Sequence, residues 1–280
     1  MSIRSIYRPL LSSIWLISMI GISPMLAQSD TLLIPKLLEP PSIDGQLDEW
    51  KLLAHHDGLW DIFRLQNTPW YSAVRNRLTQ HEETSGLLGD LQARYYTAWD
   101  EEYLYMGAEV WDNRNDTSSH REGPHRWYDK DGVAWFVEAP ADEINERFGQ
   151  GDNSYCLIAD PNRPSSSAWW RHGDPDATYI EVPVPAEAIE YVVTLNPWDR
   201  SEGDYIIEAK VHMASTMAKS DPDWVPPQEG HIYRLMIVHC DPDGGEYGGH
   251  FLMYGTGDDD SSWYPAKLTG PIHPPKRKVK

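Results

Sequence analysis

Aspartate side chains stand at the ends of several strand-like runs, where carboxylate oxygens can do one of two kinds of chemistry. Asp100 and Asp112 each follow an aromatic run, and Asp131 precedes one. Such residues cap turns by accepting hydrogen bonds from backbone N–H groups, and they also supply the hard oxygen ligands that Ca²⁺ requires in number. Turn capping is the commoner role. The sequence therefore leaves both a structural turn and a calcium site open for these three residues.

A further acidic motif, Asp241-Pro242-Asp243-Gly244-Gly245, has the opening of a calcium-binding loop. One residue separates Asp241 from Asp243, so both carboxylates can face a common centre. A complete EF-hand also needs a bidentate acid several residues later and flanking helices, and the sequence supplies no helices here. We therefore expect either a hairpin turn or a calcium site at Asp241 and Asp243, beside another acidic cluster at 258–260.

Short strands must position these groups. Residues 93–111 predict a β-hairpin around an acidic turn, and residues 133–138 alternate as a third strand. Further strand-like runs, each bounded by Pro, Gly or Asp, cover 154–159, 178–183, 190–195, 204–213, 231–239 and 250–254. Together these runs predict an all-β fold, an antiparallel β-sandwich of about ten strands.

Three other segments have less regular patterns. Leu47 and Trp50 have the one-turn spacing of a short helical turn, and we expect the segment 43–50 to be structural. Residues 69–83 carry a possible helical stripe, which predicts a loop or helical insertion before the core hairpin. Residues 160–176 are expected to form a Pro/Ser-rich loop, whose adjacent Trp169 and Trp170 either face a partner or cover the core.

The first 27 residues have the composition of a secretory signal peptide. Arg4 and Arg8 supply a positive start, residues 10–22 are mostly apolar, and cleavage is expected after Ala27. The apolar run is shorter than the ~20 residues of a membrane-spanning helix. We therefore expect a mature chain that is secreted, periplasmic or at the cell surface, without a membrane span. It would consist of one domain over 28–275 and a disordered basic tail over 276–280.

Charge and cysteine content limit the partners further. The chain has 24 Lys and Arg against 43 Asp and Glu, a net charge of −19, which argues against nucleic acid because phosphate binding needs a basic surface. Cys156 and Cys240 are the only cysteines. An exported chain can join them in a disulfide, but both stand in apolar strand-like runs, so two buried free thiols are an equal alternative.

Six short motifs follow one another in a specific order along the chain. They are IDGQLDEW (43–50), ARYYTAWDEEYLYMGAEVWDN (93–113), WYDKDGVAWF (127–136), YIIEAKV (205–211), GHIYRLMIVHCDPDGG (230–245) and SSWYPAKLTG (261–270). This order resembles carbohydrate-binding module family 9 over about residues 40–270. The resemblance implies a β-sandwich that contains structural calcium. It also implies that the domain binds carbohydrate and serves as an appendage to enzymes more than as an enzyme.

The resemblance also implies where a sugar binds. In the family two tryptophans form a slot for a terminal sugar, because planar rings suit its apolar C–H faces. The first falls on Trp127 or Tyr128, since Trp127 stands one residue too early for the family spacing, and the second falls on Trp263. Two charged groups of the family are missing here. Its glutamate would fall on Ala134 and its arginine near Cys156, so other groups must hold the rim of any bound sugar.

Three classes of function remain open at this stage. Carbohydrate binding without catalysis is the first, with structural calcium at the family-favoured Asp100, Asp112 and Asp131. A haem or electron-transfer module is the second, because related sandwiches bind haem through axial side chains. A glycoside hydrolase that uses two carboxylates is the third, although no pair of acids stands out. The available haem ligands would be Met106, Met213, Met236, His212 and His239.

Overall fold

The computed structural model describes residues 31–54, 70–72, 77–79, 91–117, 127–142, 148–162, 167–174, 177–242, 249–252 and 260–271. The predicted signal peptide, the basic tail and Asp243 lie outside these residues. The described chain is nearly all β. No helix in the described ranges is long and apolar enough to cross a membrane.

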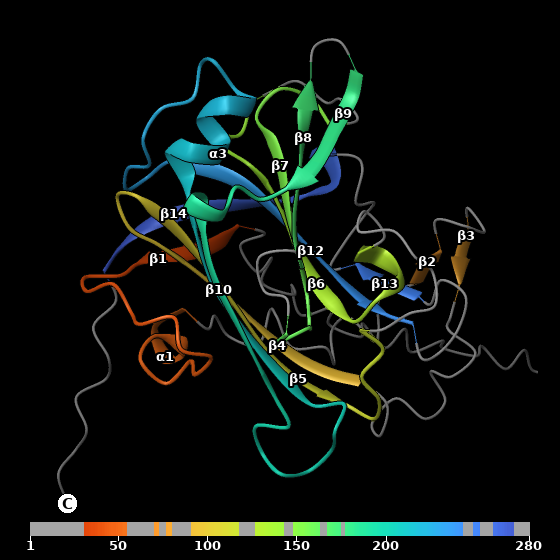
Figure 1. Ribbon diagram of the computed structural model, residues 1–280. Helices are drawn as coiled ribbons and strands as arrows, with labels where there is room; N and C mark the ends of the chain where they lie inside the picture. The colour runs from red at the N-terminus through yellow and green to blue at the C-terminus, as the bar shows by residue number, and fades with distance from the viewer. Residues whose placement is uncertain are drawn as a thin grey trace, which may run out of the picture. The chain divides into compact units, whose positions relative to one another are not determined.

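The strands and helices follow one another along the chain as shown in Figure 1. The strands are β1 (Leu32–Lys36), β2 (Trp70–Ser72), β3 (Arg77–Thr79), β4 (Leu91–Trp99), β5 (Tyr103–Asp112), β6 (Gly132–Glu138), β7 (Asp152–Ile158), β8 (Ala168–Asp174), β9 (Ala177–Pro183), β10 (Ile189–Leu195), β11 (Tyr205–His212), β12 (Ile232–Asp241), β13 (Gly249–Leu252) and β14 (Tyr264–Pro271). The helices are α1 (Lys51–Ala54) and α3 (Met213–Ser220), with 3₁₀ turns η2 (Trp127–Asp129), η4 (Ala186–Ala188) and η5 (Asp260–Ser262).

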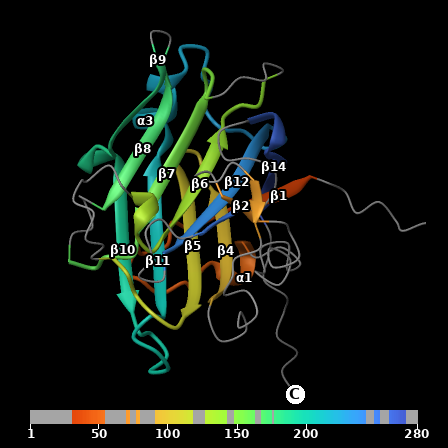
Figure 2. The same ribbon diagram turned by 90° about the vertical axis from the view of Figure 1, so that its right-hand side faces the viewer.

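One curled sheet contains nearly all the described strands. Its order is β10-β11-β5-β4-β1-β14-β12-β6-β7-β8-β9, with β13 paired to β12. In Figure 2, β8, β7, β6 and β12 cross in front of β10, β11, β5 and β4, which are the two layers of the sandwich. The predicted all-β sandwich is thus confirmed. Its neighbours pair antiparallel except at β1, which pairs parallel with both β14 and β4.

The core forms because the inward faces of both layers carry large rings. Trp135, Tyr155 and Tyr233 come from one layer and Tyr95 and Tyr205 from the other, and all are fully buried. One face of the hairpin at 93–111 must pack against the opposite layer. This is why its aromatic residues alternate along the strands, as predicted.

A buried imidazole joins the two layers within this core. The Tyr95 hydroxyl lies 2.7 Å from His239 Nδ1, and the Tyr205 hydroxyl lies 3.2 Å from His239 Nε2. A neutral imidazole has one donor and one acceptor nitrogen, so two hydroxyl groups satisfy it. Burial lowers the pKa of His239 to about 3, which keeps the ring neutral.

The segment 43–50 is structural, as predicted, and a single carboxylate on β11 fixes it. Glu208 accepts hydrogen bonds from the backbone N–H groups of Asp44 and Gly45 at 2.9 and 2.8 Å, and from Trp50 Nε1 at 2.8 Å. Gly45 has a φ of 83°, and a Cβ there would lie 2.3 Å from Thr194 Oγ1. Only glycine therefore fits this close turn against β10.

Two local predictions were wrong. The described part of 69–83 is a short antiparallel hairpin, β2 with β3, in place of a helical stripe, and Tyr71 pairs with Leu78 across it. Residues expected as a Pro/Ser-rich loop include β8, whose Trp169 and Trp170 are both buried. In the second case, aromatic cross-strand packing outweighs the loop composition.

Candidate functional site

One face of the layer formed by β12, β6, β7, β8 and β9 carries a group of charged and aromatic side chains. Residues directly opposite each other in antiparallel strands share a face, so the register defines rows across it. The first row is Arg234, Glu138 and Asp152. The second row is Met236, Phe136, Ser154, Arg171 and Glu181. The third row is Val238, Ala134, Cys156, Trp169 and Pro183.

Aromatic rings surround the arginine of the second row. The Arg171 guanidinium carbon lies 4.3 Å from the ring centroid of Tyr179, 5.5 Å from that of Phe148 and 5.7 Å from that of Trp127. Phe148 in turn packs against Trp263, with centroids 6.2 Å apart. We call Trp127, Phe148, Tyr179 and Trp263 the aromatic cluster. A guanidinium within about 6 Å of several rings is held by cation–π attraction.

A shared carboxylate oxygen anchors Arg171 and Trp127 to each other. Glu181 Oε2 accepts hydrogen bonds from Arg171 Nε at 3.0 Å, from Arg171 Nη2 at 2.7 Å and from Trp127 Nε1 at 3.1 Å. The carboxylate and guanidinium side chains are 13% and 11% exposed. This ion pair is therefore largely shielded from water, and its geometry is fixed by three donors on one oxygen.

The backbone at Phe148 is strained. Its φ is 60°, in the left-handed region that a bulky residue rarely adopts. The ring is nevertheless buried between Arg171 and Trp263. The turn that follows holds this conformation, because Asp152 Oδ2 accepts a hydrogen bond from Gly149 N–H at 2.7 Å. Such strain persists where the surrounding contacts fix it, commonly at functional sites.

The structure brings the three predicted sugar-binding residues to this face. Trp127 and Tyr128 belong to η2 and meet edge to face, with centroids 5.6 Å apart. Trp263 lies on the other side of Arg171 and Phe148, against Phe136 at 5.6 Å. Trp127 and Trp263 are only 5% and 3% exposed, while Tyr128 is half-buried. Arg171 contacts Trp127 and Phe148, and Phe148 contacts Trp263, so packed side chains link the two covered indoles.

Three of the five predicted metal ligands converge. One carboxylate oxygen from each of Asp112, Asp131 and Asp241 lies within 4.8 Å of the others, and all three side chains are buried. We call these residues the Asp131 cluster. They come from the end of β5, the residue before β6 and the end of β12. Two oxygens bound to one Ca²⁺ at about 2.3–2.6 Å can lie up to about 5 Å apart, so this cluster fits a shared calcium ion.

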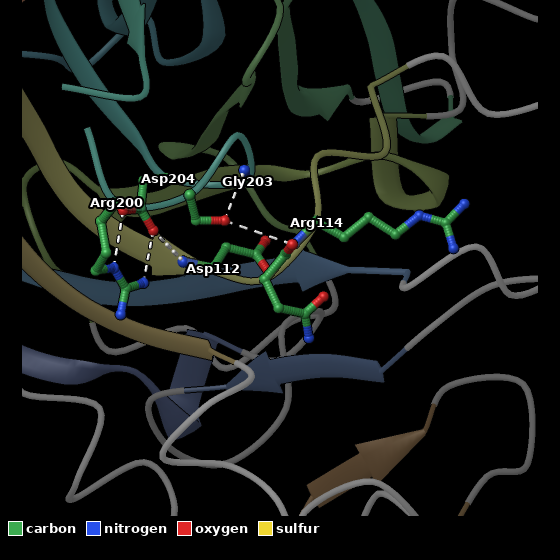
Figure 3. Close-up of polar contacts among 7 residues, drawn as sticks. Asp112, Arg114, Arg200, Gly203 and Asp204 are labelled. Carbon is green, nitrogen blue, oxygen red and sulfur yellow. Dashed lines mark hydrogen bonds and ion pairs between the residues drawn. The ribbon is translucent and has the colours of Figure 1, made fainter. Parts of the chain in front are cut away.

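Neighbouring polar groups hold the backbone of Asp112 in place, as Figure 3 shows. Its N–H donates to Asp204 Oδ1 at 2.9 Å, and Arg200 binds the two oxygens of Asp204 at 2.6 and 2.9 Å. Asp112 Oδ1 also caps the turn at Arg114 N–H. A pocket of about 500 Å³ opens beside this turn, lined by residues such as Asn113, Asn196 and Glu202. The aromatic cluster does not line it.

The other two predicted ligands do not join this cluster. Asp100 caps the β4–β5 turn, accepting hydrogen bonds from the N–H groups of Glu102 and Tyr103 and from the Tyr105 hydroxyl. It stands at the opposite end of the β4–β5 hairpin from Asp112. The turn-capping alternative therefore describes Asp100. Asp243 lies outside the described residues.

A second group of buried carboxylates was not predicted as a unit. Glu138, Asp152 and Asp260 also bring one oxygen each to within 4.8 Å of the others. We call them the Asp152 cluster. Burial, together with Asp260 and Glu138, raises the pKa of Asp152 to about 9. Burial also raises the pKa of Glu138 to about 7. The sequence did not indicate this group because Asp152 begins a strand and Glu138 is distant from it along the chain. Only the acidic run 258–260 indicated a cluster here.

The residues considered for haem have structural positions. Met106, Met213 and Met236 are fully buried in the core. His239 is the neutral bridge between Tyr95 and Tyr205. His212 Nδ1 lies 2.6 Å from the hydroxyl of Ser215 in the first turn of α3.

Comparison with known proteins places the chain in a family. Residues 64–273 match the family described as carbohydrate family 9 binding domain-like. The chain belongs to this family. No curated protein matches it.

Solved structures share the fold of this family 9 chain. One is a family 9 carbohydrate-binding module from Caldicellulosiruptor kristjanssonii in complex with cellotriose, with 17% identity, a TM-score of 0.53, and coverage of 89% of this chain and 97% of that chain. A complex of a module from the same organism with glucose has 17% identity, a TM-score of 0.50 and coverage of 87% and 99%. A putative carbohydrate-binding protein from Bacteroides uniformis has 10% identity, a TM-score of 0.52 and coverage of 85% and 98%. At these identities the likeness concerns the fold.

Proposed function

We propose that this family 9 chain is a non-catalytic carbohydrate-binding module, and that it binds sugar on the face that carries the aromatic cluster. The observation that carries the proposal is the Arg171–Glu181 ion pair, which is enclosed by Trp127, Tyr179 and Phe148. Planar rings match the apolar faces of a sugar, and a few fixed polar groups orient its hydroxyl groups. This face supplies both kinds of group within one site.

Arg171 and Glu181 account for the two charges that the family has and this sequence lacks. The family glutamate would fall at Ala134 and its arginine near Cys156, both in the third row of the face. Arg171 and Glu181 occupy the neighbouring second row on β8 and β9. We infer that the polar contacts with sugar have moved to these strands.

Exposure decides which rings meet the ligand first. Tyr179 is 37% exposed and Tyr128 is half-buried, whereas Trp127 and Trp263 are covered. We infer that a sugar ring approaches over Tyr179 and Tyr128, and that the two indoles form the wall behind them. A terminal sugar that reached both indoles would require Phe148 to rotate away from Trp263.

Calcium at the Asp131 cluster is part of the same proposal. The ion would be held by Asp112, Asp131 and Asp241, where it would fix the loop before β6 against the ends of β5 and β12. Its role would be structural. We further propose that the module acts outside the cytoplasm, after removal of the segment ending at Ala27, in the breakdown of polysaccharides.

Isothermal titration calorimetry with glucose and cellotriose, the ligands of the similar solved modules, tests this function. A glycan array extends the test to other sugars. We expect saturable binding that falls at least tenfold in Tyr179→Ala and Arg171→Met, with no release of reducing sugar from polysaccharide. Glu190→Gln is a matched control, because its carboxylate pairs with Lys210 on β10 and β11, away from this face. Absence of binding to every glycan, or equal binding in all variants, would contradict the proposed site.

A further inference from the structure

Three carboxylates are buried together at the end of β6 and the start of β7, in the Asp152 cluster. Glu138 and Asp152 pair directly across the two strands, and Asp260 reaches them from η5. Their exposed fractions are 1%, 0% and 2%. Buried carboxylates are stable only when positive charge or hydrogen-bond donors compensate them.

Among the described residues, Arg234 brings a guanidinium to this cluster. Arg234 Nε lies 3.3 Å from Glu138 Oε2 across the β12–β6 pair. When all three carboxylates are ionised, they and this guanidinium together carry a formal charge of −2 in a shielded position. A divalent cation would balance this charge.

One carboxylate oxygen in the cluster lacks a donor. Asp152 Oδ2 accepts a hydrogen bond from Gly149 N–H, but Asp152 Oδ1 is buried and accepts none from the described residues. An ionised oxygen left unsatisfied in a buried position destabilises the folded protein. The oxygen belongs to the most deeply buried member of a group whose oxygens lie within 4.8 Å of one another. That spacing fits oxygens around a single ion with metal–oxygen distances of about 2.3–2.6 Å.

We propose that Glu138, Asp152 and Asp260 bind a divalent cation of the Ca²⁺ type, separate from any ion at the Asp131 cluster. Asp131 precedes β6 and Glu138 ends it. Seven residues of extended chain separate the two positions by about 23 Å. The two clusters therefore cannot share an ion.

A cation here would fix two rings of the aromatic cluster. On one side, Asp152 holds the turn that starts at the strained Phe148. On the other side, Asp260 begins the η5 turn, and its carbonyl accepts a hydrogen bond from Trp263 N–H at 2.9 Å. Phe148 and Trp263 pack against each other. The ion would thus join the two turns that carry these rings.

Calorimetric titration of chelator-treated full chain with CaCl₂ tests the proposal. Asp152→Asn keeps the shape of the side chain and the acceptor for Gly149 N–H, and Glu138→Gln is a second variant if the first does not fold. We expect each to lose one calcium equivalent relative to the unaltered chain. Glu208→Gln is the matched control, since this buried carboxylate is satisfied by three N–H donors and should not change the number of ions bound.

Asp112→Asn separates this site from the Asp131 cluster. If both clusters bind calcium, Asp112→Asn and Asp152→Asn each lose one equivalent and the double variant loses both. Loss in Asp152→Asn alone supports the present proposal and contradicts calcium at the Asp131 cluster. Unchanged stoichiometry and affinity in both Asp152→Asn and Glu138→Gln, with circular dichroism showing folded protein, would overturn the proposal.

Discussion

Trp263 N–H donates a hydrogen bond to the carbonyl oxygen of Asp260 over 2.9 Å, so a ring of the aromatic cluster and a carboxylate of the Asp152 cluster belong to one turn. The same relationship recurs across the site at Phe148, whose turn is held by Asp152. Two rings of the aromatic cluster are therefore held by turns that also carry carboxylates of the Asp152 cluster.

Removing calcium should lower the stability of the domain. A ligand that binds only the folded state at 100 times its Kd adds about 2.7 kcal/mol to the free energy of unfolding. We therefore expect the Tm to fall by several degrees in a chelator and to recover on addition of CaCl₂. Differential scanning calorimetry measures both changes. Equal Tm values in chelator and calcium would contradict structural calcium at either cluster.

Replacing Arg171 with Met should reduce both stability and sugar binding. Without the guanidinium, the Trp127 indole N–H would be the one remaining donor to Glu181 among the described residues. Removing one partner of a buried ion pair costs about 3–5 kcal/mol. The double variant Arg171→Met, Glu181→Gln removes the uncompensated charge. We expect it to recover most of the free energy of unfolding, measured in urea, without recovering sugar affinity. Recovery of affinity as well would mean that Arg171 contributes only to folding.

Glu208→Gln should loosen the segment 43–50 without affecting the proposed sugar-binding face. In the unaltered protein both oxygens of Glu208 accept hydrogen bonds from N–H donors. The glutamine amide keeps one acceptor oxygen, but its NH₂ group would face N–H donors in place of the other. Hydrogen bonds to a charged group contribute about 1.5–3 kcal/mol each, so we expect a loss of at least 2 kcal/mol. Urea unfolding measures this loss. A concurrent change in sugar or calcium affinity would show that the segment is coupled to the site.

Both cysteines should be unreactive thiols in the folded protein. Cys156 and Cys240 are free and buried, and burial raises the pKa of each thiol above its usual value. Thiolate, the reactive form, is therefore scarce. We expect a disulfide-exchange reagent such as Ellman's reagent to label two thiols per chain in denaturant and none in native buffer. Two labelled thiols in the native protein would contradict this packing.

Much of the architecture was predictable because strand signals are local. The aromatic alternation of 93–111 and 133–138 predicted two strands of the hairpin and β6, and the DPDGG turn placed the end of β12 within a residue or two. β8 was missed because its sequence, AWWRHGD, follows a Pro/Ser-rich stretch and lacks β-branched residues. Its pairing with β7 and β9, a long-range effect, makes it a strand.

The same error hid part of the candidate site. Arg171 lies on β8, so the prediction of a loop there gave no reason to place the arginine on the proposed binding face. Conversely, Asp112, Asp131 and Asp241 were found because each stands at a predicted strand end. Glu138 and Asp152 were missed because antiparallel pairing of β6 and β7 brings them together, and spacing along the chain does not encode that contact.

The short strand β1 joins the two halves of the sheet. It forms the link between β4 and β14, and Leu32 pairs with Ala266 from the other end of the chain. During synthesis this seam cannot close until residues 264–271 have emerged, so β1 pairs with β14 only after the other described strands have been made. A fragment that ends before β14 would therefore leave the first strand without its main neighbour and the sheet open along that line.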